Sequence, residues 1–157
     1  MRVLAIDPGY DRLGLAVVEG DPSRPVLVWS DCVTPEKGAR SLRLARVYAE
    51  VVAAIERYTP NMLALETLFF STNVKTAMGV AEARGAVLAA AGSMSVSVYE
   101  HSPQTVKLAA TGDGRASKAA IARMMPKMIS LLPHKKYVDD ELDAIALAIA
   151  ALASRPR

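Results

Sequence analysis

Four acidic residues of this chain have the types and positions needed to hold divalent metal ions: Asp7, Glu66, Asp140 and Asp143. Asp7 and Glu66 each follow a short apolar run, residues 3–6 and 62–65, a pattern typical of a buried strand that meets a turn. Binding sites in open α/β sheets form beyond the carboxyl ends of such strands. Asp140 and Asp143 stand three residues apart at the start of a predicted helix, where that spacing places both side chains on one face.

Carboxylates brought together in this way repel one another, and a divalent cation with hard oxygen ligands relieves the repulsion. Mg²⁺ fits such a donor set, with Mn²⁺ as a substitute. Two such ions can hold the attacking and leaving oxygens of an in-line phosphodiester displacement. The four acids therefore predict a two-metal site for phosphodiester chemistry.

Each acid also has a simpler interpretation when it is taken alone. Asp7 precedes Pro8-Gly9 and would serve as a turn former, whereas acids in the first turn of a helix favour its macrodipole. Asp139 and Asp143 are four residues apart and share a helix face as readily as Asp140 and Asp143 do. Spacing alone therefore leaves the choice between Asp139 and Asp140 open.

The elements that would position these acids predict an α/β fold, a mixed five-stranded sheet flanked by helices. Apolar runs and alternation predict strands over residues 3–6, 13–17, 26–33, 62–65 and 96–100. Helical periodicity predicts helices over residues 41–58, 73–91, 116–132 and 140–153. Short links between the first strands favour an antiparallel start. Pro126 predicts a kink or a break near Met125.

Length and composition limit the class of protein. The 157 residues are enough for one domain, residues 1–157, and 52% apolar residues exclude a disordered chain. The longest apolar run, residues 144–153, is too short to span a bilayer and predicts a buried helix. Cys32 is the only cysteine, so no disulfide can form within the chain. We therefore expect a protein of a reducing, cytoplasmic compartment without membrane contact.

Positive charge is concentrated in one third of the chain. Residues 101–138 hold seven Lys or Arg against one acid, a charge of +6, so the net charge of +3 leaves −3 for the remaining residues. A basic segment of this kind indicates contact with a polyanion and a steep dependence on salt. Besides two lysines discussed below, the cations that would contact a nucleic-acid backbone are Arg115, Arg123, Lys127, Lys135 and Lys136. A solvated helix face is the simpler interpretation of these cations, and for Lys135 and Lys136 taken singly it is the favoured one.

Five sequence blocks, in chain order, resemble the RuvC family of Holliday-junction resolvases over about residues 2–153. The blocks are Ile6-Asp7-Pro8-Gly9 with Gly14; Leu65-Glu66 leading to Phe69; Asn73 with Ala81-Glu82-Ala83-Arg84-Gly85; Lys107 with Gly112-Asp113-Gly114-Arg115-Ala116-Ser117-Lys118; and Asp140-Glu141-Leu142-Asp143-Ala144. The resemblance implies an RNase H-like (retroviral-integrase-like) fold, which agrees with the strand order predicted above.

The resemblance also implies roles for single residues. Asp7, Glu66, Asp140 and Asp143 become the catalytic carboxylates that hold two divalent ions, which favours Asp140 over Asp139. Metal-activated water would hydrolyse a phosphodiester and leave 5′-phosphate and 3′-hydroxyl ends. Lys107 and Lys118 would act close to the scissile phosphate. Phe69 would stack on a base at the junction centre. Burial is the default role of either phenylalanine when the residues are taken alone, and packing is the role expected for Phe70.

The resemblance further implies partners: four-way junction DNA, a second copy of the chain, a junction-binding tetramer and a branch-migration helicase. The helix over residues 73–91, rich in Ala and Met, is the expected dimer face. Three alternatives remain. An actin-like or sugar-kinase-type ATPase would need a second phosphate loop and a longer chain. A junction-binding module without catalysis and another RNase H-like nuclease are the other two.

Overall fold

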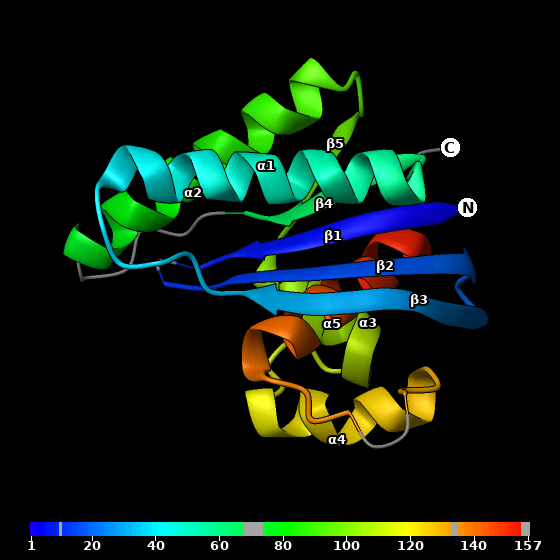
Figure 1. Ribbon diagram of the computed structural model, residues 1–157. Coiled ribbons are helices and arrows are strands. Elements are labelled where there is room, and N and C mark those ends of the chain that lie inside the picture. The colour runs from blue at the N-terminus through cyan, green and yellow to red at the C-terminus, as the bar shows by residue number, and fades with distance from the viewer. Residues whose placement is uncertain (10, 68–73, 133–134, 155–157) are drawn as a thin grey trace.

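The computed structural model describes residues 1–9, 11–67, 74–132 and 135–154 (Figure 1). The strands are β1 (Arg2–Pro8), β2 (Leu13–Asp21), β3 (Arg24–Val33), β4 (Met62–Glu66) and β5 (Val98–His101). The helices are α1 (Arg40–Tyr58), α2 (Val74–Ser93), α3 (Pro103–Thr111), α4 (Lys118–Met128) and α5 (Asp139–Ala153). None of the helices in the described ranges is long and apolar enough to cross a membrane.

The strands form one mixed sheet in the order β3-β2-β1-β4-β5. β1 pairs antiparallel with β2, and β2 pairs antiparallel with β3, whereas β4 runs parallel to both β1 and β5. The predicted α/β class, the five strands and the antiparallel start are therefore confirmed. The central strand β1 lies between an antiparallel and a parallel neighbour.

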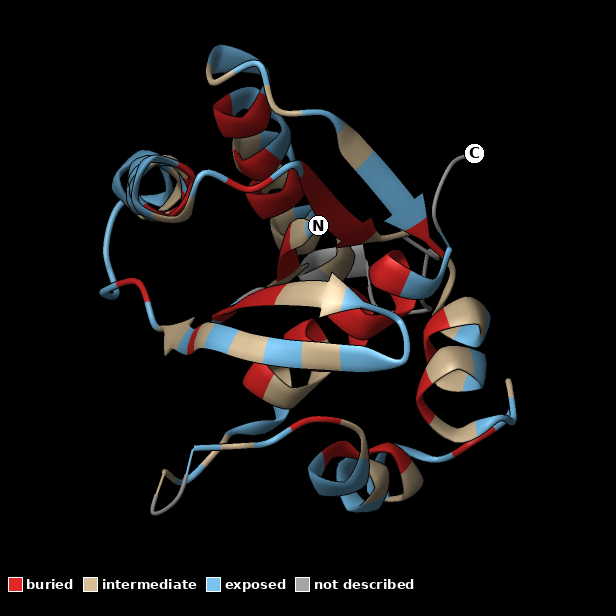
Figure 2. Ribbon diagram, turned by 90° about the vertical axis from the view of Figure 1, so that its right-hand side faces the viewer, coloured by how far each residue is buried: buried red, intermediate tan, exposed pale blue. Residues whose placement is uncertain are grey.

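Helices cover both faces of the sheet, α1 and α2 on one face and α5 with α3 and α4 on the other (Figure 1). β1 alternates between the two cores: Leu4 and Ile6 pack toward α1 and α2, whereas Val3 and Ala5 pack toward α5. Residues 144–152 of α5 are all buried, because this helix lies between the sheet and the outer helices. Figure 2 shows the buried residues gathered on the surfaces that face these cores. The predicted buried helix over residues 144–153 is thus confirmed.

The predicted set of helices needs two corrections. The helix α3 was not predicted at all, although its N-terminal signal is present: Ser102 accepts a hydrogen bond from the Thr105 amide, and Pro103 occupies the first turn. With nine residues, α3 is too short to show a clear helical period. The helix predicted over residues 116–132 spans only Lys118–Met128. It continues through Pro126 and ends two residues later, so the break expected near Met125 does not occur there, although Pro126 has no N–H to donate within the helix.

Candidate active site

The parallel pairing of β1 and β4 brings the first two acids to one edge of the sheet. Ile6 is the partner of Leu65 in the register, so Asp7 and Glu66 each come one residue later on adjacent strands. Both side chains are partly buried at the carboxyl ends of these strands. The sheet therefore places this pair where the sequence predicted a site.

Gly14 of β2 brings the N-terminus of α5 to the same edge. Gly14 is the antiparallel partner of Asp7, and a Cβ atom at Gly14 would lie only 2.0 Å from the backbone oxygen of Asp140. Because no larger residue fits between β2 and α5 at this point, glycine permits the contact that places the first turn of α5 beside Asp7. Asp140 and Asp143 are partly buried, whereas Asp139 is exposed.

The four acids interact electrostatically. The pKa of Asp7 is raised to about 7, first by burial and then by the charges of Asp143, Glu66 and Asp140. The pKa of Glu66 is also raised, by burial and by Asp143. Mutual repulsion of this kind indicates that the site holds more negative charge than the surrounding protein compensates. The four acids that the sequence singled out are thus near enough to interact by charge, and Asp140, but not Asp139, is among the groups that raise the pKa of Asp7.

Two cations reach this acidic group. Lys118, at the start of α4, donates from Nζ to Asp143 Oδ2 at 2.6 Å, and that hydrogen bond is the main reason why the pKa of Lys118 is raised. Arg12, in the β1–β2 connection, has Nε 3.0 Å from Asp140 Oδ2. Lys107 on α3 is near enough for its charge to lower the pKa of Glu66. Lys107 and Lys118 were predicted as site residues, but Arg12 was missed.

Arg84, a buried residue of α2, supports the end of β4. Its Nη1 donates to the backbone oxygen of Glu66 at 2.7 Å, and its Nη2 pairs with Glu100 of β5 at 2.5 Å. The sequence placed Arg84 in a family-like block without giving it a role, because both contacts join segments far apart in the chain. Arg84 thus links the strand that carries Glu66 to its neighbours.

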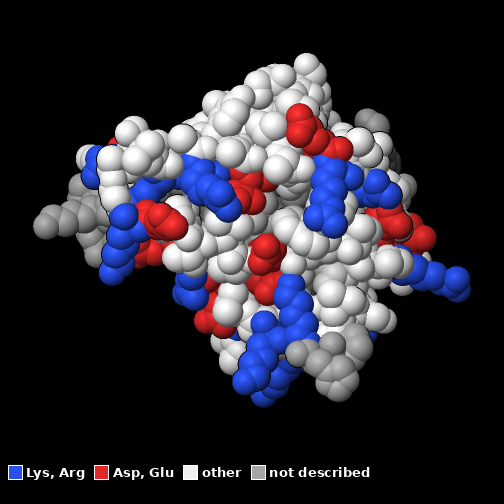
Figure 3. All heavy atoms as spheres, in the orientation of Figure 1, with Lys and Arg blue, Asp and Glu red and all other residues white. Residues whose placement is uncertain are grey.

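The residues predicted to contact DNA differ in exposure. Arg115 is exposed between α3 and α4, and Arg123 is exposed on α4. In Figure 3, Lys and Arg side chains gather over the α4 part of the face shown. Phe69 and Phe70 lie outside the described residues. Lys135 was expected to contact a nucleic-acid backbone, but its Nζ instead pairs with the buried Glu141 and donates to the Ser30 backbone oxygen at 2.6 Å.

The four acids have the type of oxygen ligand that a divalent cation prefers. All four provide hard carboxylate oxygens, and Asp140 Oδ2 is buried without an aligned hydrogen bond, although Arg12 Nε is close. Among the described residues, no three His, Cys, Asp or Glu side chains are placed closely enough together to hold one ion. Asp140 is instead paired with Arg12, and Asp143 with Lys118.

Acidic residues gathered at the ends of parallel strands and at the start of a helix that crosses the same sheet define the protein as an RNase H-like nuclease. A family profile described as crossover junction endodeoxyribonuclease RuvC matches residues 3–151. The chain belongs to this family of metal-dependent nucleases, which hydrolyse phosphodiester bonds. The resemblance found in the sequence is confirmed, and the ATPase alternative is excluded.

Individual relatives agree with the family assignment. The crossover junction endodeoxyribonuclease RuvC of Thermotoga petrophila is 39% identical over 159 residues, covering 100% of this chain and 96% of the relative. That of Thermomicrobium roseum is 40% identical over 149 residues, covering 95% and 91%. Thermus thermophilus RuvC in complex with a Holliday junction substrate superposes with a TM-score of 0.87 at 33% identity, covering 96% of this chain and 92% of that one. The yeast mitochondrial Holliday junction resolvase, at 14% identity and a TM-score of 0.72, shares the fold, covering 96% and 77%.

Proposed function

We propose that the protein resolves four-way DNA junctions through paired, symmetric nicks made by two copies of the chain. The observation that carries this proposal is the group of four coupled carboxylates at one sheet edge, where the pKa of Asp7 is raised to about 7. The similar Thermus thermophilus protein was solved with a Holliday junction substrate, which supports the choice of substrate. Homologous recombination and DNA repair would be the processes served.

Asp7, Glu66, Asp140 and Asp143 would be the residues that hold two divalent ions, with Mg²⁺ as the preferred metal and Mn²⁺ as a substitute. When bound, the ions would supply an activated water and neutralise charge in the transition state, leaving 5′-phosphate and 3′-hydroxyl ends. The raised pKa of Asp7 means that its carboxyl group would release a proton when a cation binds near neutral pH.

Lys118 and Lys107 would stabilise the negative charge that develops on the scissile phosphate. Lys118 is already hydrogen-bonded to Asp143, so its ammonium group lies at the edge of the proposed metal site. Arg115 and Arg123 would contact the DNA backbone from the same side of the fold. Phe69 would stack on a base at the junction centre, an interaction of about 1–3 kcal/mol.

An exposed stripe on α2 supports a homodimer. Met78, Ala81, Gly85, Leu88 and Gly92 are all exposed and follow one another at alternating spacings of three and four residues. A Cβ atom at Gly85 or Gly92 would meet nothing within 4 Å, so this face has room for close helix–helix contact. A second copy packed here would set two active sites on one junction. By analogy with the family, a junction-binding tetramer and a branch-migration helicase would be further partners in the cytoplasm.

The proposal is tested by incubating the protein with a synthetic four-way junction, a linear duplex and an RNA–DNA hybrid, each with Mg²⁺ or with EDTA. We expect paired nicks in the junction in the presence of Mg²⁺, little cutting of the other two substrates, and no cutting in EDTA. Equal cutting of all three would contradict junction selectivity. Binding of the junction without cutting under any metal condition would favour the binding-module alternative.

A further inference from the structure

Arg12 is paired with one of the four carboxylates, although neither the sequence nor the family resemblance gave it a role. We propose that Arg12 acts as a built-in competitor of the metal: it occupies Asp140 in the metal-free protein and must leave before a divalent ion can bind there. Arg12 would thereby set the metal concentration at which the site fills. The inference rests on the proposed metal site and adds a regulating residue to it.

The contact between the two side chains is close but poorly aligned. Arg12 Nε lies 3.0 Å from Asp140 Oδ2, yet this oxygen is buried and accepts no aligned hydrogen bond from any described residue. A carboxylate oxygen has more than one lone pair, so Asp140 Oδ2 keeps acceptor capacity beside Arg12. A divalent ion is a better partner than Arg12, because it offers twice the charge and needs no alignment of a hydrogen atom.

The carboxylate is fixed, whereas the arginine is able to move. The Asp140 side chain is 19% exposed, and its backbone lies against Gly14 so closely that no Cβ fits between them. The Arg12 side chain is 49% exposed and begins in a connection between strands. Exchange of partners would therefore occur through displacement of the Arg12 guanidinium into solvent, not through movement of Asp140.

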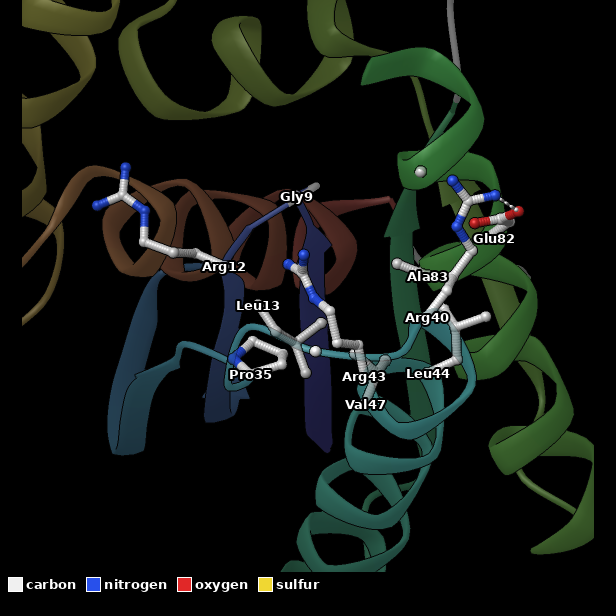
Figure 4. Close-up of a pocket in the computed structure, with 12 residues that line it drawn as sticks. Gly9, Arg12, Leu13, Pro35, Arg40, Arg43, Leu44, Val47, Glu82 and Ala83 are labelled. Atoms are coloured by element: carbon white, nitrogen blue, oxygen red, sulfur yellow. Dashed lines mark hydrogen bonds and ion pairs between the residues drawn. The ribbon is translucent and has the colours of Figure 1, made fainter. Parts of the chain in front are cut away.

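The other arginines near this connection have different partners. A cavity of about 310 Å³ is lined by Gly9, Arg12, Arg40 and Arg43, among others. Figure 4 shows Arg40 extending from α1 toward Glu82 and Arg43 extending from α1 toward Leu13, while Arg12 points away from both. Arg40 pairs with Glu82 and Arg43 pairs with Asp11, whereas Arg12 pairs with Asp140, a proposed metal ligand.

The neighbouring pair of Lys118 and Asp143 is built differently. Lys118 makes a hydrogen bond of 2.6 Å to its carboxylate and matches a family position near the scissile phosphate. The Arg12 contact lacks an aligned hydrogen bond. Each of the two cations pairs with one aspartate of α5. Removal of Arg12 should therefore raise the affinity for metal.

The test is the binding of Mn²⁺ alone, followed by electron paramagnetic resonance and calorimetry without DNA. The variants are Arg12→Ala and Arg12→Gln, where Gln keeps a polar group but not the charge. Arg46→Ala is the matched control, because Arg46 forms an exposed ion pair with Glu50 on α1. We expect Mn²⁺ to bind about tenfold more tightly to both Arg12 variants, a change typical of removing one nearby positive charge, and Arg46→Ala to bind like the wild type.

Unchanged or weaker Mn²⁺ binding by the Arg12 variants would overturn the proposal, and weaker binding would mean that Arg12 positions Asp140 for the metal. Near-ultraviolet circular dichroism of each variant establishes that the fold is retained. An Asp7→Asn variant distinguishes a failure of the proposed Arg12 role from a failure of the proposed metal site. If Asp7→Asn abolishes binding while the Arg12 variants bind like the wild type, only the role of Arg12 is refuted. If the wild type and Asp7→Asn bind Mn²⁺ equally, the proposed metal site itself fails.

Discussion

The contact between Gly14 and α5 predicts that one added methyl group will disable the site. In a Gly14→Ala variant, the new Cβ would lie 2.0 Å from the Asp140 backbone oxygen, whereas real Cβ atoms essentially never come closer than 3.0 Å. The difference, 3.0 minus 2.0, means that β2 and the first turn of α5 must separate by about 1 Å. Since Asp140 and Asp143 lie on this turn, both would move away from Asp7.

The expected losses of cleavage rate and of stability follow from that displacement. A misplacement of about 1 Å in a catalytic group costs on the order of 100-fold in rate. Overpacking of a close contact also lowers the free energy of unfolding, by about 1–3 kcal/mol. We therefore expect Gly14→Ala to remain folded but to cleave a four-way junction about 100-fold more slowly than the wild type.

The assay is single-turnover cleavage of a synthetic junction at saturating protein, with urea unfolding measured in parallel. Gly38→Ala is the matched control, because a Cβ atom at Gly38 would meet nothing within 4 Å. The control should cleave and unfold like the wild type. A Gly14→Ala variant that cleaves within threefold of the wild-type rate would refute the placement of α5 against β2.

Three other predictions concern stability and assembly. Without metal, the raised pKa of Asp7 means that the folded protein keeps a proton which the unfolded chain loses between about pH 4 and 7. Burial of Asp7 therefore lowers the free energy of unfolding as pH rises, by about 4 kcal/mol in total. Urea unfolding in EDTA should show that Asp7→Asn removes this pH-dependent loss. Equal pH profiles for the wild type and Asp7→Asn would contradict the prediction. Lys135→Ala should lower the free energy of unfolding by about 3–5 kcal/mol, because it leaves Glu141 buried and unpaired. Lys136→Ala, at an exposed neighbouring position, should unfold like the wild type. Equal unfolding midpoints for the two variants would refute this prediction. Leu88→Glu should be monomeric in analytical ultracentrifugation and should lose paired nicking of the junction. A dimer that persists in this variant would exclude α2 as the interface.

The sequence was sufficient for those parts of the site that depend on local patterns. An apolar run followed by an acid located Asp7 and Glu66 at strand ends, because burial of a strand and the end of that strand are both visible in neighbouring residues. The choice between Asp139 and Asp140 was not local. It depends on how α5 meets β2 at Gly14, and helical spacings of three and four residues are equally acceptable.

The remaining parts of the site depend on contacts between distant segments. Arg12 and Asp140 are separated by most of the chain, so no periodicity links them, and the same holds for Lys135 with Ser30. Lys135 was counted with the basic surface because its charge was visible in the sequence and its buried partner was not. α3 was missed for a different reason, since its cap at Ser102 was recognisable but its nine residues were too few for a period.

In the proposed mechanism, the four carboxylates are required for cleavage of DNA and not primarily for its binding. The most direct measurement compares wild type, Glu66→Gln and Glu56→Gln for binding to a four-way junction in EDTA and for cleavage after Mg²⁺ is added. Glu56 is an exposed acid on α1, so its substitution makes the same chemical change away from the site. We predict that all three proteins bind the junction equally and that only Glu66→Gln fails to cleave it. Cleavage by Glu66→Gln at the wild-type rate would contradict the account.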